Sequence, residues 1–143
     1  MLGRNSYTRE ELDSSTTGIG EPLAAYRGLA AAVGNGGPDG DAASALEGFE
    51  ARFFNNMVIV LDRYFVHRVR NVTGKDGNPL NEVELLADSL MSNGGVLKHS
   101  NVIKLNPEES VLKLQIGDPI RVTAEEFERL AAAFIAEIER KFL

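Results

Sequence analysis

The sequence predicts an α+β fold that is mainly helical, with three or four packed helices and a small antiparallel β-hairpin or sheet before the C-terminal helix. Three observations lead to this prediction. Apolar residues recur at helical spacing over most of the chain, capping patterns mark several helix starts, and two short runs near the C-terminal end alternate apolar and polar residues. The length of 143 residues fits one domain covering residues 1–143.

The first helix is predicted to begin at a capping box, the sequence TREE at residues 8–11. In this pattern the threonine hydroxyl and the glutamate carboxylate each accept a hydrogen bond from a first-turn amide. Two glycines and Pro22 then interrupt the helical pattern. Either a second helix begins near Pro22 or one kinked helix passes through it, and both alternatives stay open. Residues 34–41, GNGGPDGD, predict a flexible surface loop.

A long helix is predicted from about residue 41 to residue 71. Its broad apolar arc favours neighbours on two sides. The arc comprises Phe53, Phe54, Met57, Val58, Val60, Leu61, Tyr64, Phe65 and Val69. A second stripe consists of Arg52, Asn56, Ile59, Arg63, Val66 and Arg70. A purely solvated stripe has no need of Ile59 and Val66, so these two are predicted to contact a second subunit, a neighbouring helix or a ligand.

A further helix is predicted to begin at Asn78 and Pro79, which suit an N-cap and the first helical position. It is expected to run to about Met91, with Met91 buried, and to end at the Asn-Gly-Gly sequence of residues 93–95. The preceding GKDGN turn, residues 74–78, lacks the glycine and Ser/Thr positions of a P-loop and the ligand positions of an EF-loop. It is therefore predicted to be a plain tight turn.

Strand signals follow in the runs 102–105 and 111–116, which alternate apolar and polar residues, and in residues 120–122. They predict a two- or three-stranded antiparallel sheet with one face on the helices. A second capping box, TAEE at residues 123–126, predicts the start of the last helix. The small residues at 131–136 would let another helix approach this one closely.

Composition narrows the possible function classes. The net charge is −6, which argues against nucleic acid and anionic membrane surfaces as partners. The chain has no cysteine, so disulfides, thiolate nucleophiles and iron–sulfur clusters are excluded. The first residues, MLGRNSYTREEL, lack the apolar region of a secretory signal, and no apolar run is long enough to span a membrane. A cytoplasmic protein is expected.

Charges of opposite sign meet around the turn between the two central helices. The cationic side contains Arg68, Arg70 and Lys75, and the anionic side contains Asp76, Glu82, Glu84 and Asp88. If the two helices are antiparallel neighbours, the cations lie at one helix C-terminus and the anions at a helix N-terminus, where the helix dipoles favour them. The two groups are expected to pair with each other, and the alternative is a site that also recruits an outside anion.

Candidate site residues lie around this corner. The candidate ligands for an anion are Arg63, His67, Arg70, Lys75 and Asn78. The candidates for acid–base catalysis are His67, Asp76 and Glu82. Glu84 and Asp88, one helical turn apart, are weak candidates for binding a divalent metal. Neither a metal nor a cofactor is predicted.

A family resemblance covers about residues 50–143. It is carried by the run FFNNMVIVLDRYFVHRVRNVTGKDGNPLNEVELLADSLM and by IKLNPEESVLKLQIGDPI. These segments resemble a group of short uncharacterised proteins encoded in actinobacteria. The resemblance implies a soluble bacterial protein and brings no activity, substrate or catalytic residue with it.

The resulting functional hypothesis is a non-enzymatic binding or interaction module that self-associates, as a dimer, through a helix face. That face would contain Ile59 and Val66, or alternatively the segment 131–136. The alternative hypothesis is a small-molecule binder or enzyme that acts on an anionic compound, bearing phosphate or carboxylate, at the corner formed by residues 62–82.

Overall fold

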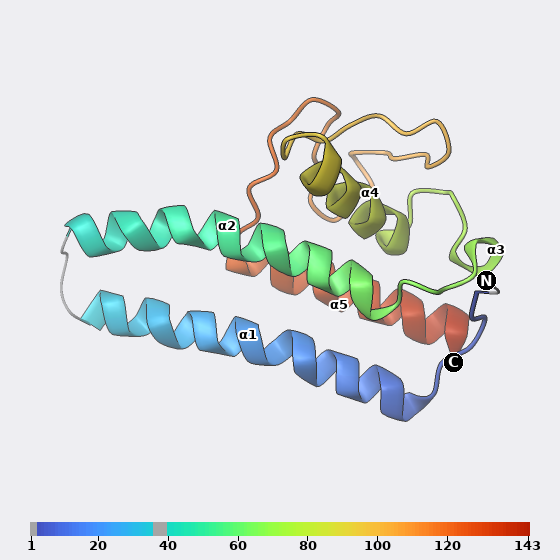
Figure 1. The fold of residues 1–143 in the computed structure, drawn as a ribbon, viewed down its shortest axis with the longest axis horizontal. Coiled ribbons are helices and arrows are strands. Elements are labelled where there is room, and N and C mark those ends of the chain that lie inside the picture. The colour runs from blue at the N-terminus through green and yellow to red at the C-terminus, as the bar shows by residue number, and fades with distance from the viewer. Residues whose placement is uncertain (1–2, 36–39) are drawn as a thin grey trace.

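The computed structural model describes residues 3–35 and 40–143, and these residues form five helices (Figure 1). The helices are α1 (Arg9–Asn35), α2 (Gly40–Tyr64), α3 (Arg70–Thr73), α4 (Pro79–Ser92) and α5 (Ala124–Phe142). The predicted α+β fold is wrong, because the described residues form two isolated β-bridges and no strand or sheet. None of the helices in the described part combines the length and apolar content needed to cross a membrane.

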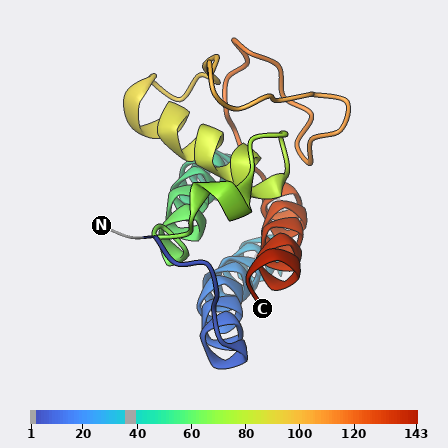
Figure 2. The same ribbon diagram turned by 90° about the vertical axis from the view of Figure 1, so that its right-hand side faces the viewer.

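The long helices α1, α2 and α5 lie at the corners of a triangle when the molecule is viewed along them, and α4 packs above α2 and α5 (Figure 2). The core lies between these elements. Its fully buried side chains include Phe54, Leu61, Leu86, Phe127 and Phe134. This arrangement leaves two faces of α2 to consider: one toward α4 and one toward solvent beside α1.

The first helix confirms the capping box and settles the question left open at Pro22. The Thr8 hydroxyl accepts from the Glu11 amide at 3.1 Å, and the Glu11 carboxylate accepts from the Thr8 amide at 2.8 Å. One helix, α1, continues through Pro22. The loop predicted for residues 34–41 is wrong at its edges, because α1 reaches Asn35 and α2 begins at Gly40. Its centre, residues 36–39, lies outside the described residues.

Helix α2 ends at Tyr64, so the helix predicted to reach residue 71 is too long. The buried side chain of Arg68 supplies a physical reason. Its guanidinium donates to the backbone carbonyl of Phe65 at 2.7 Å and, at 3.4 Å, to that of Asp62, and these carbonyls lie in and just after the last turn of α2. A cationic side chain folded back in this way stabilises a helix C-terminus.

The predicted caps of the last two long helices are confirmed. The Asn78 side chain accepts from the Leu80 amide at 2.9 Å, with Pro79 as the first residue of α4. At the start of α5, the Thr123 hydroxyl accepts from the Glu126 amide at 3.2 Å, and the Glu126 carboxylate accepts from the Thr123 amide at 3.1 Å. These local patterns define both helix starts.

The segment between α4 and α5 is an irregular loop in place of the predicted hairpin. Side chains there accept from backbone amides that a strand partner would otherwise satisfy. The Ser100 hydroxyl accepts from the amides of Val102 and Ile103 at 3.1 and 3.0 Å. From α2, the Asn55 side chain accepts from the Val122 amide at 3.1 Å and donates to the Ile120 carbonyl at 2.8 Å. Five apolar residues of these runs were predicted to face the helices. Ile103 and Leu112 are buried and Leu105 and Leu114 are partly buried against the core, whereas Ile116 is 50% exposed, so the prediction is wrong for Ile116.

Candidate functional site

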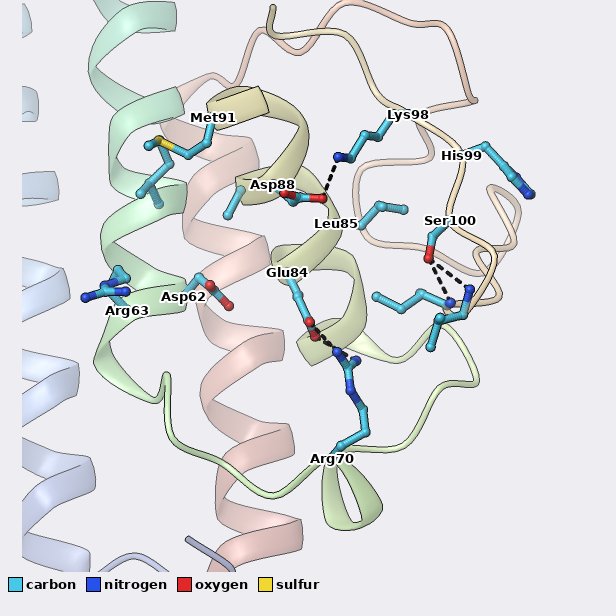
Figure 3. A pocket seen from close by; sticks show the side chains of 14 residues that line it. Asp62, Arg63, Arg70, Glu84, Leu85, Asp88, Met91, Lys98, His99 and Ser100 are labelled. Atoms are coloured by element: carbon cyan, nitrogen blue, oxygen red, sulfur yellow. Dashed lines mark hydrogen bonds and ion pairs between the residues drawn. The ribbon is translucent and has the colours of Figure 1, made fainter. Parts of the chain in front are cut away.

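A groove of about 760 Å³ lies between α2, α4 and the loop that follows α4 (Figure 3). Leu85 and Ile103 are buried and Ile59 is half-buried, so these side chains form its floor. Met91 is 71% exposed and Val102 is 55% exposed at its mouth. The prediction that Met91 is buried is therefore wrong. Covering two such side chains would contribute roughly 1.5–3 kcal/mol each.

Ion pairs surround these apolar residues. Arg70 donates twice to Glu84, at 2.6 and 3.0 Å, and Lys98 pairs with Asp88 at 2.8 Å (Figure 3). The remaining carboxylate among the described lining residues, Asp62, also has a cationic partner. The groove thus offers apolar surface beside charges that neutralise one another.

The partner of Asp62 is Arg68, whose side chain is only 6% exposed. Its guanidinium donates to the Asp62 carboxylate at 2.8 Å and lies 5.6 Å from the centre of the Phe134 ring. It also lies 3.9 Å from Glu84. This buried cation links the end of α2 to Glu84 within α4 and to Phe134 in the middle of α5, a role that was not predicted from the sequence. Its place in a run of basic residues after a helix was the available signal.

The predicted pairing of charges across the bend is confirmed for Arg70 and Glu84. Lys75, Asp76 and Glu82 form no ion pair with any described residue, and the carboxylates of Asp76 and Glu82 accept hydrogen bonds from uncharged groups instead. The prediction is therefore correct for the groove wall and wrong for the turn itself.

The five predicted anion ligands do not come together. Arg63 and Arg70 both line the groove, but Arg70 is engaged by Glu84 and the Arg63 side chain points away from the groove (Figure 3). His67 and Lys75 are exposed elsewhere. Asn78 is committed to the cap of α4. An incoming anion would find no cluster of free cations among these residues.

The turn before α4 is held by its own amide side chains. The Asn78 side chain donates to the Thr73 carbonyl and to the Asp76 carboxylate, both at 2.7 Å. The hydrogen bond from the Asn78 side chain to the Asp76 carboxylate is the main reason that the pKa of Asp76 lies below its ordinary value. Asp76, a predicted acid–base candidate, is thus an ionised acceptor that fixes the turn.

A second amide completes this turn. The buried Asn81 side chain accepts from the Gly77 amide at 3.0 Å and donates to the Gly74 carbonyl at 2.9 Å. Gly77 has φ of +85°, and a Cβ there would lie 2.1 Å from the carbonyl oxygen of Lys104. Only glycine fits where the turn meets the long loop.

Glu82, another predicted acid–base candidate, is 4% exposed. Its two carboxylate oxygens accept from the backbone amides of Val111 and Leu112 at 2.8 and 2.9 Å. Burial raises the pKa of Glu82, and these two hydrogen bonds oppose the rise. Because no solvent-facing site surrounds it, the carboxylate serves as an anchor for the loop.

The weak metal candidates, Glu84 and Asp88, face the same groove but pair with Arg70 and Lys98. Over residues 3–35 and 40–143, no group of three or more His, Asp or Glu side chains lies close enough together to hold a metal ion. The geometry gives no support to a carboxylate-bound cation here.

The two predicted interface residues separate. Ile59 lines the groove, whereas Val66 lies beyond the end of α2 beside a hollow of about 170 Å³. The continuous stripe predicted from helical spacing therefore breaks after Arg63, because the helix ends at Tyr64. The alternative segment, 131–136, packs in part against α1, where Ala131 is buried.

Lys98 and Val102 were not predicted as site residues because they lie in the segment expected to lead into and form a strand.

Comparison of the chain with protein-family models, with curated proteins and with solved structures gives no match in any of the three. The functional argument consequently rests on the geometry alone.

Proposed function

We propose that this protein is a non-enzymatic interaction module that binds a segment of another polypeptide in the α2–α4 groove and that also self-associates. The observation that carries the proposal is the combination of exposed Met91 and Val102 with ion pairs that leave no carboxylate of the groove unpaired among the described residues. An apolar centre with a polar rim is the usual anatomy of a protein-binding surface.

The groove favours an amphipathic helix that carries aliphatic side chains. Two of its walls are helices, and helix-in-groove recognition depends on apolar anchors spaced one turn apart. Met91 suits such a site because its unbranched thioether side chain adapts to differently shaped partners. The paired rim attracts no particular ion, so specificity comes from the shape and spacing of the apolar anchors.

The alternative, an enzyme or binder for an anionic compound, receives less support. Arg68 and Arg70 already bond to carboxylates, and Arg63 points away from them. An anion would have to displace an existing partner from a bidentate arginine contact. The acid–base candidates Asp76 and Glu82 both hold backbone or side-chain groups of the fold.

The test uses amide NMR spectra with two probes. One probe is a helical peptide of about 14 residues with leucine at positions a and d of each heptad, and the other is inorganic phosphate. We expect the peptide to shift resonances around Ile59, Met91 and Val102, and this response to be lost in Met91→Asp. Leu143→Asp, an equally drastic change at an exposed leucine on the far end of α5, should leave it intact.

Phosphate should leave both the spectrum and the melting temperature unchanged. A rise in melting temperature with phosphate that disappears in Arg63→Ala would favour the anion-binding alternative. Peptide-induced shifts that survive in Met91→Asp would remove the groove as the binding surface.

A further inference from the structure

The outer face of the α1–α2 pair exposes a second apolar surface, separate from the groove. Leu29, Phe49, Val60 and Tyr64 are each between 40% and 48% exposed. Helix α5 lies on the opposite side of this pair, and no other described helix covers the outer face (Figure 2). We call these four residues the outer stripe.

Contacts between the helices place the outer stripe along one seam. A Cβ on Gly18 would lie 2.3 Å from the Tyr64 hydroxyl, so α1 and α2 meet there. Farther along, the Phe53 ring stacks on Tyr26, with centroids 6.1 Å apart, and on Phe49 at 5.4 Å. At about 100° per residue, positions 49, 53, 60 and 64 of α2 fall within an arc of about 60°.

On α1, Leu29 lies eleven positions after Gly18, which is about three helical turns along the same face. The stripe thus continues from one end of the contact between the two helices toward the other. From Phe49 to Tyr64 the stripe is about 22 Å long. A face of this length and two helices wide covers about 450 Å², roughly half of what each partner contributes to a standard protein interface, which is the size of a weak dimer contact.

Unpaired charges of opposite sign border the stripe. Arg52 and Arg63 lie along its α2 edge, and Glu21 lies along its α1 edge. None of the three forms an ion pair or hydrogen bond with any described residue. Figure 3 shows the Arg63 side chain directed away from the groove. One edge is therefore cationic and the other anionic, which makes the face complementary to a copy of itself.

From this arrangement we infer that the outer stripe binds a second copy of this chain about a two-fold axis parallel to the helices. This inference rests on the proposed self-association and names its surface. The axis places α1 of each copy on α2 of the other, giving an antiparallel four-helix arrangement. A two-fold axis across the helices would instead bring acidic edge against acidic edge.

The register of α1 against α2 adds a specific contact. Gly18 lies beside Tyr64, and Tyr26 lies beside Phe53, so Glu21 is level with the last turns of α2. In the two-fold pair, Glu21 then lies within one helical turn of Arg63 of the second copy. The symmetry makes this contact twice.

The first test measures molar mass by light scattering across a dilution series. The wild-type chain is expected to be a dimer, and Phe49→Glu and Val60→Glu are expected to be monomers with unchanged helical circular dichroism. Their partial exposure means that neither change buries a charge in the monomer core. Ile116→Glu, at a residue 50% exposed on the long loop, is the matched control and should remain a dimer.

A charge exchange tests the symmetry. Glu21→Arg and Arg63→Glu should each weaken dimerisation by about an order of magnitude, because each places two like-charge contacts in the interface. An equimolar mixture of the two variants should restore the wild-type dissociation constant, since both contacts in the mixed dimer are then of opposite sign.

A wild-type chain that stays monomeric at about 0.5 mM would overturn self-association, while leaving the peptide experiment on the groove unaffected. A dimer that persists in Phe49→Glu and Val60→Glu would overturn this surface. Failure of the mixture to recover affinity would overturn the two-fold arrangement.

Discussion

Two glutamates of helix α4, two residues apart, lie in contrasting surroundings. On the side covered by the long loop, Glu82 is buried and accepts from the amides of Val111 and Leu112. On the groove side, Glu84 is partly exposed and accepts both hydrogen bonds of the Arg70 guanidinium. The same residue type thus organises backbone on one side and neutralises a surface on the other.

The two arrangements differ in what they contribute. Removing a carboxylate from water is costly, and the raised pKa of Glu82 shows that burial outweighs the two amide hydrogen bonds. Its value lies in fixing one path for a loop that has no strand ladder. The pair of Arg70 with Glu84 is exposed enough for water and salt to screen it, so it contributes little to stability.

The largest predicted effect is on the loop anchor. Glu82→Ala leaves two buried backbone amides without acceptors and should lower the free energy of unfolding by about 2–4 kcal/mol, measured by urea denaturation. Glu84→Ala, the same change on the exposed side, should cost less than about 1 kcal/mol. Equal losses in the two variants would show that the long loop does not depend on the buried carboxylate.

An intermediate effect on stability is predicted for a second pair of residues, the buried Arg68 and the exposed Arg70. Arg68→Ala removes a buried partner of Asp62 and the donor to the carbonyls at the end of α2, and should cost about 2–3 kcal/mol. Arg70→Ala should cost less than about 1 kcal/mol, because that side chain is far more exposed. Hydrogen exchange should show faster opening of the last turn of α2 in Arg68→Ala only.

The contrast also explains how much of the fold could be predicted from the sequence. Helix starts were predictable because a cap is a contact between residues three positions apart, as at Thr123 and Glu126. The hairpin was not, because alternation of apolar residues records only which side chains face inward. The alternating pattern does not reveal that the Val111 amide donates to the side chain of Glu82, 29 positions earlier, and not to a neighbouring strand.

The candidate site was predictable in its charges but not in its shape. The pairing of Arg70 with Glu84 was predictable because opposite charges flank one bend of the chain, although Arg70 lies in the short helix α3 and not at the end of α2. The groove requires the path of residues 98–103, which no local pattern determines. Met91 was predicted to be buried because helical spacing gives the direction of a side chain and not whether another element reaches it.

The smallest predicted effect is on the pH dependence of stability. Burial raises the pKa of Glu82 in the folded protein, so its contribution to stability is fully present below the ordinary value of 4.5 and is lost as pH rises through the raised pKa. Glu82→Gln removes this titration. The stability of wild type relative to Glu82→Gln should therefore fall as the pH rises above 4.5 and through the raised pKa of Glu82.

Urea denaturation at several pH values measures this difference, with Glu84→Gln as the control for the same substitution on the same helix. Glu11 makes the free energy of unfolding depend on pH in the opposite direction. It does so equally in wild type and in Glu82→Gln, so its effect cancels when the two are compared. Its pKa is lowered to about 2 by the Arg4 guanidinium and the Thr8 amide, so its contribution is present above the ordinary value of 4.5 and lost as pH falls toward 2. The difference in the free energy of unfolding between wild type and Glu82→Gln could instead stay constant with pH. The folded protein would then stabilise the charged carboxylate of Glu82 as well as water does, and its pKa would not be raised. In that case the contrast between the two sides of α4 would be one of geometry and not of electrostatics.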